Sequence, residues 1–136
     1  MILAALSLLV QQVPMLETAS GVPTANGQWR IVEQGSVVSA RFGNLVDLSC
    51  YRSNKVLRLA VSDPAQPLAP LPTRLLVSTT YGDRWVEHPA PLHVRDPLGD
   101  WMAYSRGRIL LMPEGAAPVI VPNHAEVARV IEACRS

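Results

Sequence analysis

Two cysteines, Cys50 and Cys134, constrain the fold of this 136-residue chain more than any other feature. They permit a single intramolecular pairing, and a bond between them would close most of a domain into one covalent loop. The loop-entropy model values such a cross-link at roughly 4 to 5 kcal/mol, a large share of a small domain's stability. Neither cysteine has a partner at Cys-x-x-Cys or metal-ligand spacing, which argues against zinc and thioredoxin-type sites. We expect a Cys50–Cys134 disulfide; the alternative is two buried free thiols in a reducing cytosol.

The N-terminal run is apolar over residues 1–10 apart from Ser7, and two glutamines then end it. Ten residues have the length of a signal-peptide h-region, whereas a transmembrane helix needs about 20. No Lys or Arg precedes the run, so the leader lacks the basic n-region of a typical signal peptide. The alternative is that these residues form a buried strand or short helix of a cytosolic protein.

The domain boundaries follow from this leader. Thr18 and Ser20 are small residues two apart, which fits the small-x-small pattern before a cleavage site. The sequence therefore predicts a signal peptide over residues 1–20, a flexible N-terminus over 21–27 and a single β-rich domain over 28–136. We expect the protein in the periplasm or secreted, with no stable membrane span in the mature form.

The composition argues against a nucleic-acid-binding protein and against a disordered chain. Charged residues make up only 17% of the chain and the net charge is +1, whereas phosphate binding along a nucleic acid needs a concentrated basic face. Hydrophobic residues reach 49%, which is incompatible with disorder in the body of the chain. Nucleic acid is therefore not expected as a partner.

From residue 28 onward, short β-rich segments alternate with turn residues, as in a mainly β domain of the α+β class. Their spacing of about nine to ten residues favours an antiparallel meander. We predict an antiparallel sandwich or partly open barrel of about seven or eight strands. The predicted runs are 28–33, 37–42, 45–51, 56–61, 74–79, 84–87, 108–112 and 118–121.

Prolines interrupt this pattern at two places. Residues 63–73 contain four prolines, which remove ladder donors and predict a long loop; a Pro-x-x-Pro ligand is the alternative. Pro89 and Pro91 flank a single alanine after the sixth run. We expect them to limit strand pairing there.

Two helices are predicted in the last third. Asp96 followed by Pro97 is typical of an N-cap and first helical position, so a short helix is expected near 97–105, with Gly107 ending it. Asn123 and Glu126 fit a capping box at the start of a second helix, near 124–134.

The second helix carries Cys134 on an apolar face. Val127, Val130, Ile131 and Cys134 are spaced three, one and three apart, so they share one side of the helix. A cysteine on that face can reach Cys50 at the end of a predicted strand. The expected disulfide would hold the helix against the sheet.

Several stretches resemble a known group of proteins. They are 41–43 (RFG), 48–50 (LSC), 96–108 (DPLGDWMAYSRGR) and 129–135 (RVIEACR). From Trp29 to the C-terminus the chain resembles a group of small exported alphaproteobacterial proteins of uncharacterised function. The order of parts is also similar to the invasion-associated locus B family of periplasmic β-rich domains. The resemblance implies an envelope location and a sandwich-like or barrel-like domain ending in a helix; it supplies no catalytic residue.

Arg106 and Arg108 form the sharpest polar cluster. Two arginines beside a helix end could clamp a carboxylate or phosphate on a partner. The alternative is that Arg106 interacts with the helix dipole and Arg108 flanks a strand.

Other candidate residues are less specific. His88 and His93 could hold a metal, but no third ligand follows at usable spacing, so no metal site is assigned. Asp96 and Asp100 are four apart, although N-capping explains Asp96 without catalysis. Serine-nucleophile motifs and Gly-rich phosphate loops are absent from the sequence, so no catalytic residue and no cofactor are predicted. The three tryptophans are expected in the core rather than on an exposed carbohydrate platform.

Three hypotheses for function remain. The favoured one is an exported, non-enzymatic binding or structural module of the cell envelope, which binds a protein or envelope component through a sheet face, an edge or the Arg106/Arg108 region. The second is a small hydrolase or metal-dependent enzyme that uses the His88/His93 region. The third is a cytosolic interaction protein with free thiols.

Overall fold

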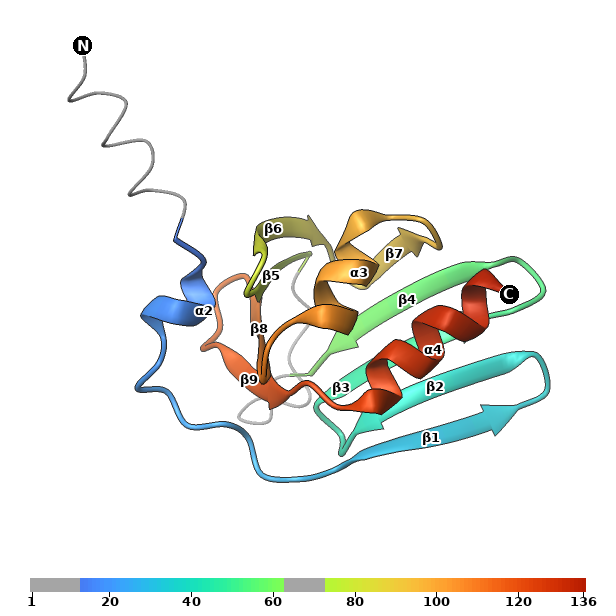
Figure 1. The fold of residues 1–136 in the computed structure, drawn as a ribbon, viewed down its shortest axis with the longest axis horizontal. Coiled ribbons are helices and arrows are strands. Elements are labelled where there is room, and N and C mark those ends of the chain that lie inside the picture. The colour runs from blue at the N-terminus through green and yellow to red at the C-terminus, as the bar shows by residue number, and fades with distance from the viewer. Residues whose placement is uncertain (1–12, 63–72) are drawn as a thin grey trace, which may run out of the picture.

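The computed structural model describes residues 13–62 and 73–136. Within these ranges the chain forms nine strands and three helices, with two antiparallel sheets and no closed barrel (Figure 1). The prediction of a mainly β, sandwich-like α+β fold is confirmed. The predictions for residues 1–12 and for the proline-rich loop over 63–72 lie outside the described residues.

The first sheet, sheet A, is a meander extended by one later strand. Its order is β1-β2-β3-β4-β7, with every neighbouring pair antiparallel. The strands are β1 (Trp29–Gln34), β2 (Val37–Phe42), β3 (Val46–Tyr51), β4 (Val56–Val61) and β7 (Ala90–His93). The first four match the predicted runs to within one residue at each end.

The second sheet, sheet B, has the order β6-β5-β8-β9. Its strands are β5 (Arg74–Thr79), β6 (Gly82–Glu87), β8 (Arg108–Pro113) and β9 (Val119–Pro122). All neighbouring pairs are again antiparallel. These four strands correspond to the last four predicted runs, with β6 beginning two residues earlier than expected.

The ninth strand, β7, occupies the place where prolines were expected to limit pairing. It pairs with β4 and forms an edge of sheet A, so only one of its sides needs backbone donors. Pro91 has no N–H group, and an edge strand is where a sheet tolerates it. The prolines therefore limit pairing to one side of β7 rather than preventing it.

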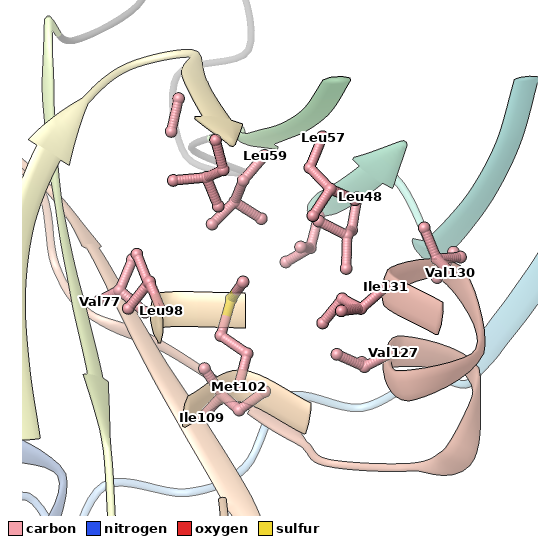
Figure 2. Packing of buried hydrophobic residues seen from close by; sticks show 14 of the residues in the cluster. Leu48, Leu57, Leu59, Val77, Leu98, Met102, Ile109, Val127, Val130 and Ile131 are labelled. Atoms are coloured by element: carbon pink, nitrogen blue, oxygen red, sulfur yellow. The ribbon is translucent and has the colours of Figure 1, made fainter. Parts of the chain in front are cut away.

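The inner faces of the sheets enclose one core together with two helices. Helix α3 (Pro97–Tyr104) contributes Leu98 and Met102, and helix α4 (Ala125–Arg135) contributes Val127, Val130 and Ile131. Figure 2 shows these side chains meeting leucines of sheet A and Val77 and Ile109 of sheet B. The helices thus fill the space between the sheets.

The two cysteines lie together at the place the sequence indicated. Their sulfur atoms are within bonding distance and their Cα atoms are 5.6 Å apart, which is a normal separation for a disulfide. Cys50 on β3 is 0% exposed and Cys134 on α4 is 1% exposed. Helix α4 packs on β2 and β3, so the cross-link joins it to the inner face of sheet A.

The helix starts were only partly predicted. The Asp96 carboxylate accepts a hydrogen bond of 2.9 Å from the Leu98 N–H, which confirms the expected N-cap of α3. The capping box at α4 is wrong: His124 is the N-cap and makes no side-chain capping bond. The Asn123 amide instead donates to the carbonyls of Ala103 (3.2 Å) and Ser105 (2.7 Å), because the end of α3 offers unpaired acceptors.

Helix α2 (Met15–Thr18) precedes both sheets and packs on the outer side of β5 and β8. No helix of the described ranges combines the length and apolar character that crossing a membrane requires.

Candidate functional site

The outer face of sheet A carries a cluster of polar side chains. Side chains alternate along each strand, so the residues between the core positions of β2, β3 and β4 point away from the core. Those residues are Val37, Ser39 and Arg41 on β2, Asp47, Ser49 and Tyr51 on β3, and Arg58 and Ala60 on β4. The three central strands thus present a polar surface opposite an entirely apolar inner face.

This surface is hollowed rather than flat. A half-open cavity of about 380 Å³ lies over the three strands, and its lining includes Ser39, Ser49, Arg58 and Tyr51. A second hollow of about 300 Å³ continues toward the β2–β3 turn. Arg41 and Asp47 line both hollows and join them into a groove. We call the surface formed by these two hollows the sheet A groove.

The floor of the groove is a connected hydrogen-bond network built from cross-strand pairs. Ser39 lies opposite Ser49, with their Oγ atoms 2.7 Å apart, and Arg41 lies opposite Asp47. Ser49 donates to Asp47 Oδ1, and the Arg41 Nε donates to Asp47 Oδ2 at 3.0 Å. Because the Ser49 proton is committed to Asp47, Ser39 is the donor to Ser49. The antiparallel register thus places all four side chains in contact.

The two serines are unusual for the outer face of a sheet. Ser39 is 2% exposed and Ser49 is 6% exposed, so their hydroxyl groups are held away from bulk water. Buried hydroxyls need partners, and these two obtain them from each other and from Asp47. The network is therefore a rigid, prearranged floor rather than a set of independent solvated side chains.

Arg58 gives the groove its charge. It lies opposite Ser49 on β4, is exposed, and has no ion-pair partner among the residues that the structure describes. The Arg41 charge is matched by Asp47 at 3.0 Å, so the positive charge of Arg58 is uncompensated within the lining. A guanidinium beside polar hydroxyls suits a carboxylate or phosphate group on a ligand.

The described lining of the groove shows no serine beside a free base, the arrangement that nucleophilic catalysis needs. A reactive serine needs a base within hydrogen-bond reach, yet the Ser49 hydroxyl donates to the ion-paired Asp47. The outer-face imidazole of His93 lies on β7, two strand spacings or roughly 10 Å from β3.

The predicted Arg106/Arg108 region is divided in the structure. Arg108 is partly buried and its Nη1 donates to the Val22 carbonyl at 3.3 Å, so it is engaged with the N-terminal segment. Arg106 is exposed, and its backbone N–H donates to Thr80 Oγ1 at 3.1 Å. Neither arginine is in an ion pair with another described residue, and of the two only Arg106 is exposed.

His88 and His93 are not brought together. His88 Nε2 accepts a hydrogen bond from the Val61 N–H at 2.9 Å, whereas His93 is the strand partner of Val56. These contacts lie at opposite ends of β4, roughly 16 Å apart at the usual rise per residue. No cluster of three or more His, Cys, Asp or Glu side chains suited to a metal occurs in residues 13–62 and 73–136.

Asp96 and Asp100 belong to separate ion pairs. Asp96 pairs with Arg84 at 2.5 Å, and Asp100 pairs with Arg135 at 2.6 Å. Burial opposes ionisation of Asp96, but hydrogen bonds from Arg84 and from the Leu98 N–H outweigh it and hold the pKa of Asp96 below its usual 3.8. Both carboxylates are thus structural partners of arginines.

The tryptophans are dispersed. Trp29 is buried, donates to the Pro122 carbonyl at 2.7 Å and packs edge-on against Phe42. Trp85 is exposed under the Arg74 guanidinium, and Trp101 lies against Gly82. The described tryptophans form no shared platform.

Sequence reasoning missed the sheet A groove although a pattern for it is present. The polar residues Ser39, Arg41, Asp47, Ser49 and Arg58 all occupy alternate positions of predicted strands. Period-two alternation shows that they share faces within each strand, but only the register shows which residues meet.

Comparisons with protein-family models, with curated proteins and with solved structures gave no match. The resemblance to exported alphaproteobacterial proteins therefore stays a prediction.

Proposed function

We propose that this chain is an exported, non-enzymatic binding module of the cell envelope, and that its sheet A groove binds an anionic group on an envelope component or partner protein. The observation that carries the proposal is Arg58. Its guanidinium has no ion-pair partner among the described residues and stands beside the buried Ser39 and Ser49 and the partly exposed Asp47, in a hollow of about 380 Å³.

The groove suits recognition because its floor is already organised. The serine hydroxyls and Asp47 are held by mutual hydrogen bonds, so little conformational entropy is lost there on binding. Arg58 supplies attraction for a carboxylate or phosphate, and Tyr51 adds an amphipathic side wall. This combination supports binding of a polar, negatively charged group rather than an apolar ligand.

Export is supported by the cysteine pair and the leader together. Disulfides persist in oxidising compartments and are rare in the cytosol, and the two sulfurs here lie within bonding distance. The apolar run over residues 1–10 has the length of a signal-peptide core. A periplasmic or secreted location explains both features, whereas a cytosolic protein with free thiols explains neither.

The binding proposal can be tested by titrating inorganic phosphate into the full chain and following backbone amide shifts by NMR. We expect saturable shifts confined to β2, β3 and β4. Arg58→Ala should weaken binding about tenfold or more, because charge-assisted hydrogen bonds are lost. Arg106→Ala is the matched control, since it removes another exposed arginine that lies away from the groove and has no ion pair with a described residue.

The two variants separate the candidate surfaces. Loss of binding in R106A with no change in R58A would move the site to the Arg106 corner and overturn the sheet A groove. Phosphate shifts scattered over the molecule, equal in both variants, would overturn specific anion binding. Co-precipitation of a partner from periplasmic extract, compared between the same variants, extends the test to a macromolecule.

The proposed location needs a separate measurement. Intact mass of protein recovered from the periplasm, with and without reductant, should show loss of the leader and the two-hydrogen difference of one disulfide. Full-length protein found only in the cytosol with two free thiols would contradict export.

A further inference from the structure

The outer face of sheet B is covered by the segment that contains α2. The contacted residues form a single row across all four strands, because Asp83 lies opposite Ser78, Ser78 opposite Leu110, and Leu110 opposite Ile120. The row changes from a carboxylate through a hydroxyl to two apolar side chains. We call this row the sheet B site.

The polar end of the row binds backbone N–H groups. The Met15 N–H donates to both carboxylate oxygens of Asp83 at 3.0 Å, and the Leu16 N–H donates to Ser78 Oγ at 2.8 Å. Ser78, 0% exposed, donates in turn to Asp83 Oδ1 at 2.5 Å. Pro14, the N-cap of α2, makes no side-chain capping bond. The Met15 and Leu16 N–H groups are instead satisfied by Asp83 and Ser78, which lie 68 and 62 positions further along the chain.

The apolar end of the row binds one side chain. Leu16 is 3% exposed and packs with Leu110 (0%) and Ile120 (1%) in a cluster separate from the main core. Leu110 and Ile120 point away from that core, so Leu16 and its neighbours are what shields them from water. The sheet B site thus binds the Leu16 side chain together with the backbone N–H groups of Met15 and Leu16.

The segment is attached to the domain by a connection that also contacts sheet B. The Ala25 N–H donates to the Ile120 carbonyl at 2.7 Å, and Arg108 binds the Val22 carbonyl. A cut near Ser20, as the sequence predicts, would leave these two contacts in place and remove Leu16. It would expose the sheet B site without disturbing the residues that form it.

We propose that the sheet B site is a docking site for a short peptide with the sequence Pro-Met-Leu-Glu-Thr, filled in cis by residues 14–18, and that a second copy of the chain can fill it in trans. The chain's own segment is the occupant because it is the sequence that the carboxylate, hydroxyl and leucine-binding row already fit. A chain that has lost residues 1–20 therefore accepts the segment of an uncleaved copy. The proposal is independent of anion binding in the sheet A groove.

The test uses full-length chains and an N-acetylated, fluorescent peptide of residues 13–22. Leu16→Asp should release the segment and let the peptide bind saturably. Wild type should bind at least about tenfold more weakly, because its own segment competes at a high effective concentration. Leu16→Ala, a milder change, provides a second opened chain if L16D does not fold.

Matched controls locate the binding. In the L16D background, Asp83→Asn should weaken peptide binding, whereas Glu87→Gln, on the same strand but outside the row, should not. A peptide carrying Leu16→Ala should bind roughly tenfold or more weakly. A folded L16D or L16A chain without saturable binding, or equal binding to wild type, would overturn the site.

The second copy is tested by mixing L16D with Leu110→Asp, which keeps a free segment but has a damaged site. Sedimentation should show each variant alone as a monomer and the mixture as a one-to-one dimer. If the peptide binds L16D but the mixture stays monomeric, a second copy is wrong as the occupant. D83N in place of L110D gives the same comparison if L110D does not fold.

Discussion

Removing the Cys50–Cys134 cross-link should cost the domain a large part of its stability. The two residues are 84 positions apart, and for a loop of that length the chain-entropy model gives about 4.5 kcal/mol at 25 °C. For a domain of this size each kcal/mol corresponds to roughly 4 °C in Tm. We therefore expect reduced wild type to unfold about 18 °C below the oxidised protein, and Cys50→Ala/Cys134→Ala to unfold at a lower temperature still.

The measurement is thermal and urea unfolding of three samples: oxidised wild type, reduced wild type, and the double alanine variant. Both cysteines are buried, so the alanine variant also loses packing, and reduced wild type isolates the cross-link itself. Reduced protein should lie between the other two. If the free energy of unfolding of reduced wild type lies within about 1 kcal/mol of the oxidised value, the idea that the cross-link stabilises the domain by restricting the unfolded chain is refuted.

The C-terminal helix should remain docked after reduction at low temperature. The Arg135 Nε donates to the Val94 carbonyl at 2.6 Å, and its Nη1 binds Asp100, in addition to the apolar contacts of α4. Amide exchange of α4 in the reduced protein should therefore be faster but still protected. Exchange at unfolded rates would mean that the disulfide alone holds α4.

Two further predictions concern α3 and the turn beside it. Asp96→Asn should lower stability by about 0.5–1 kcal/mol at pH 7 by removing the ion pair with Arg84. Folding lowers the pKa of Asp96, so the stabilisation by its carboxylate is fully present above the unfolded-state pKa near 4. This stabilisation is lost as the pH falls through the lower folded-state pKa. The urea midpoints of variant and wild type should therefore converge in acid. Gly82→Ala should cost about 1–3 kcal/mol, since φ is +154° and the new Cβ would lie 3.2 Å from the Trp101 ring. Gly21→Ala, with open space around it, should be neutral in the same unfolding assay.

Most of the fold was predictable because its strands are bounded by turn residues that act locally. Gly35 and Gly43 adopt positive φ at the turns that end β1 and β2, which few other residues tolerate. The apolar face of α4 is likewise a property of spacing alone. These features depend on residues close in sequence, so the sequence carries them directly.

The features that the sequence did not predict depend on contacts between residues far apart in sequence. Asn123 caps the end of α3 instead of its own helix because the carbonyls of Ala103 and Ser105 lie beside it only in the folded chain. The sheet A groove requires the register that sets Ser39 against Ser49. Nothing local in the sequence indicates that Asp83 would bind the Met15 N–H.

The burial of Cys50 and Cys134 limits the stage of folding at which their disulfide can form. Cys50 belongs to the early meander of sheet A, whose neighbouring strands are local in sequence and suited to rapid pairing, whereas Cys134 follows every described strand. Once folded, the two sulfurs are 0% and 1% exposed, so an oxidant or oxidase could not reach them. The bond must therefore form before the core closes around the two sulfurs. A chain whose core closes while the cysteines are reduced would keep both thiols sealed inside the protein.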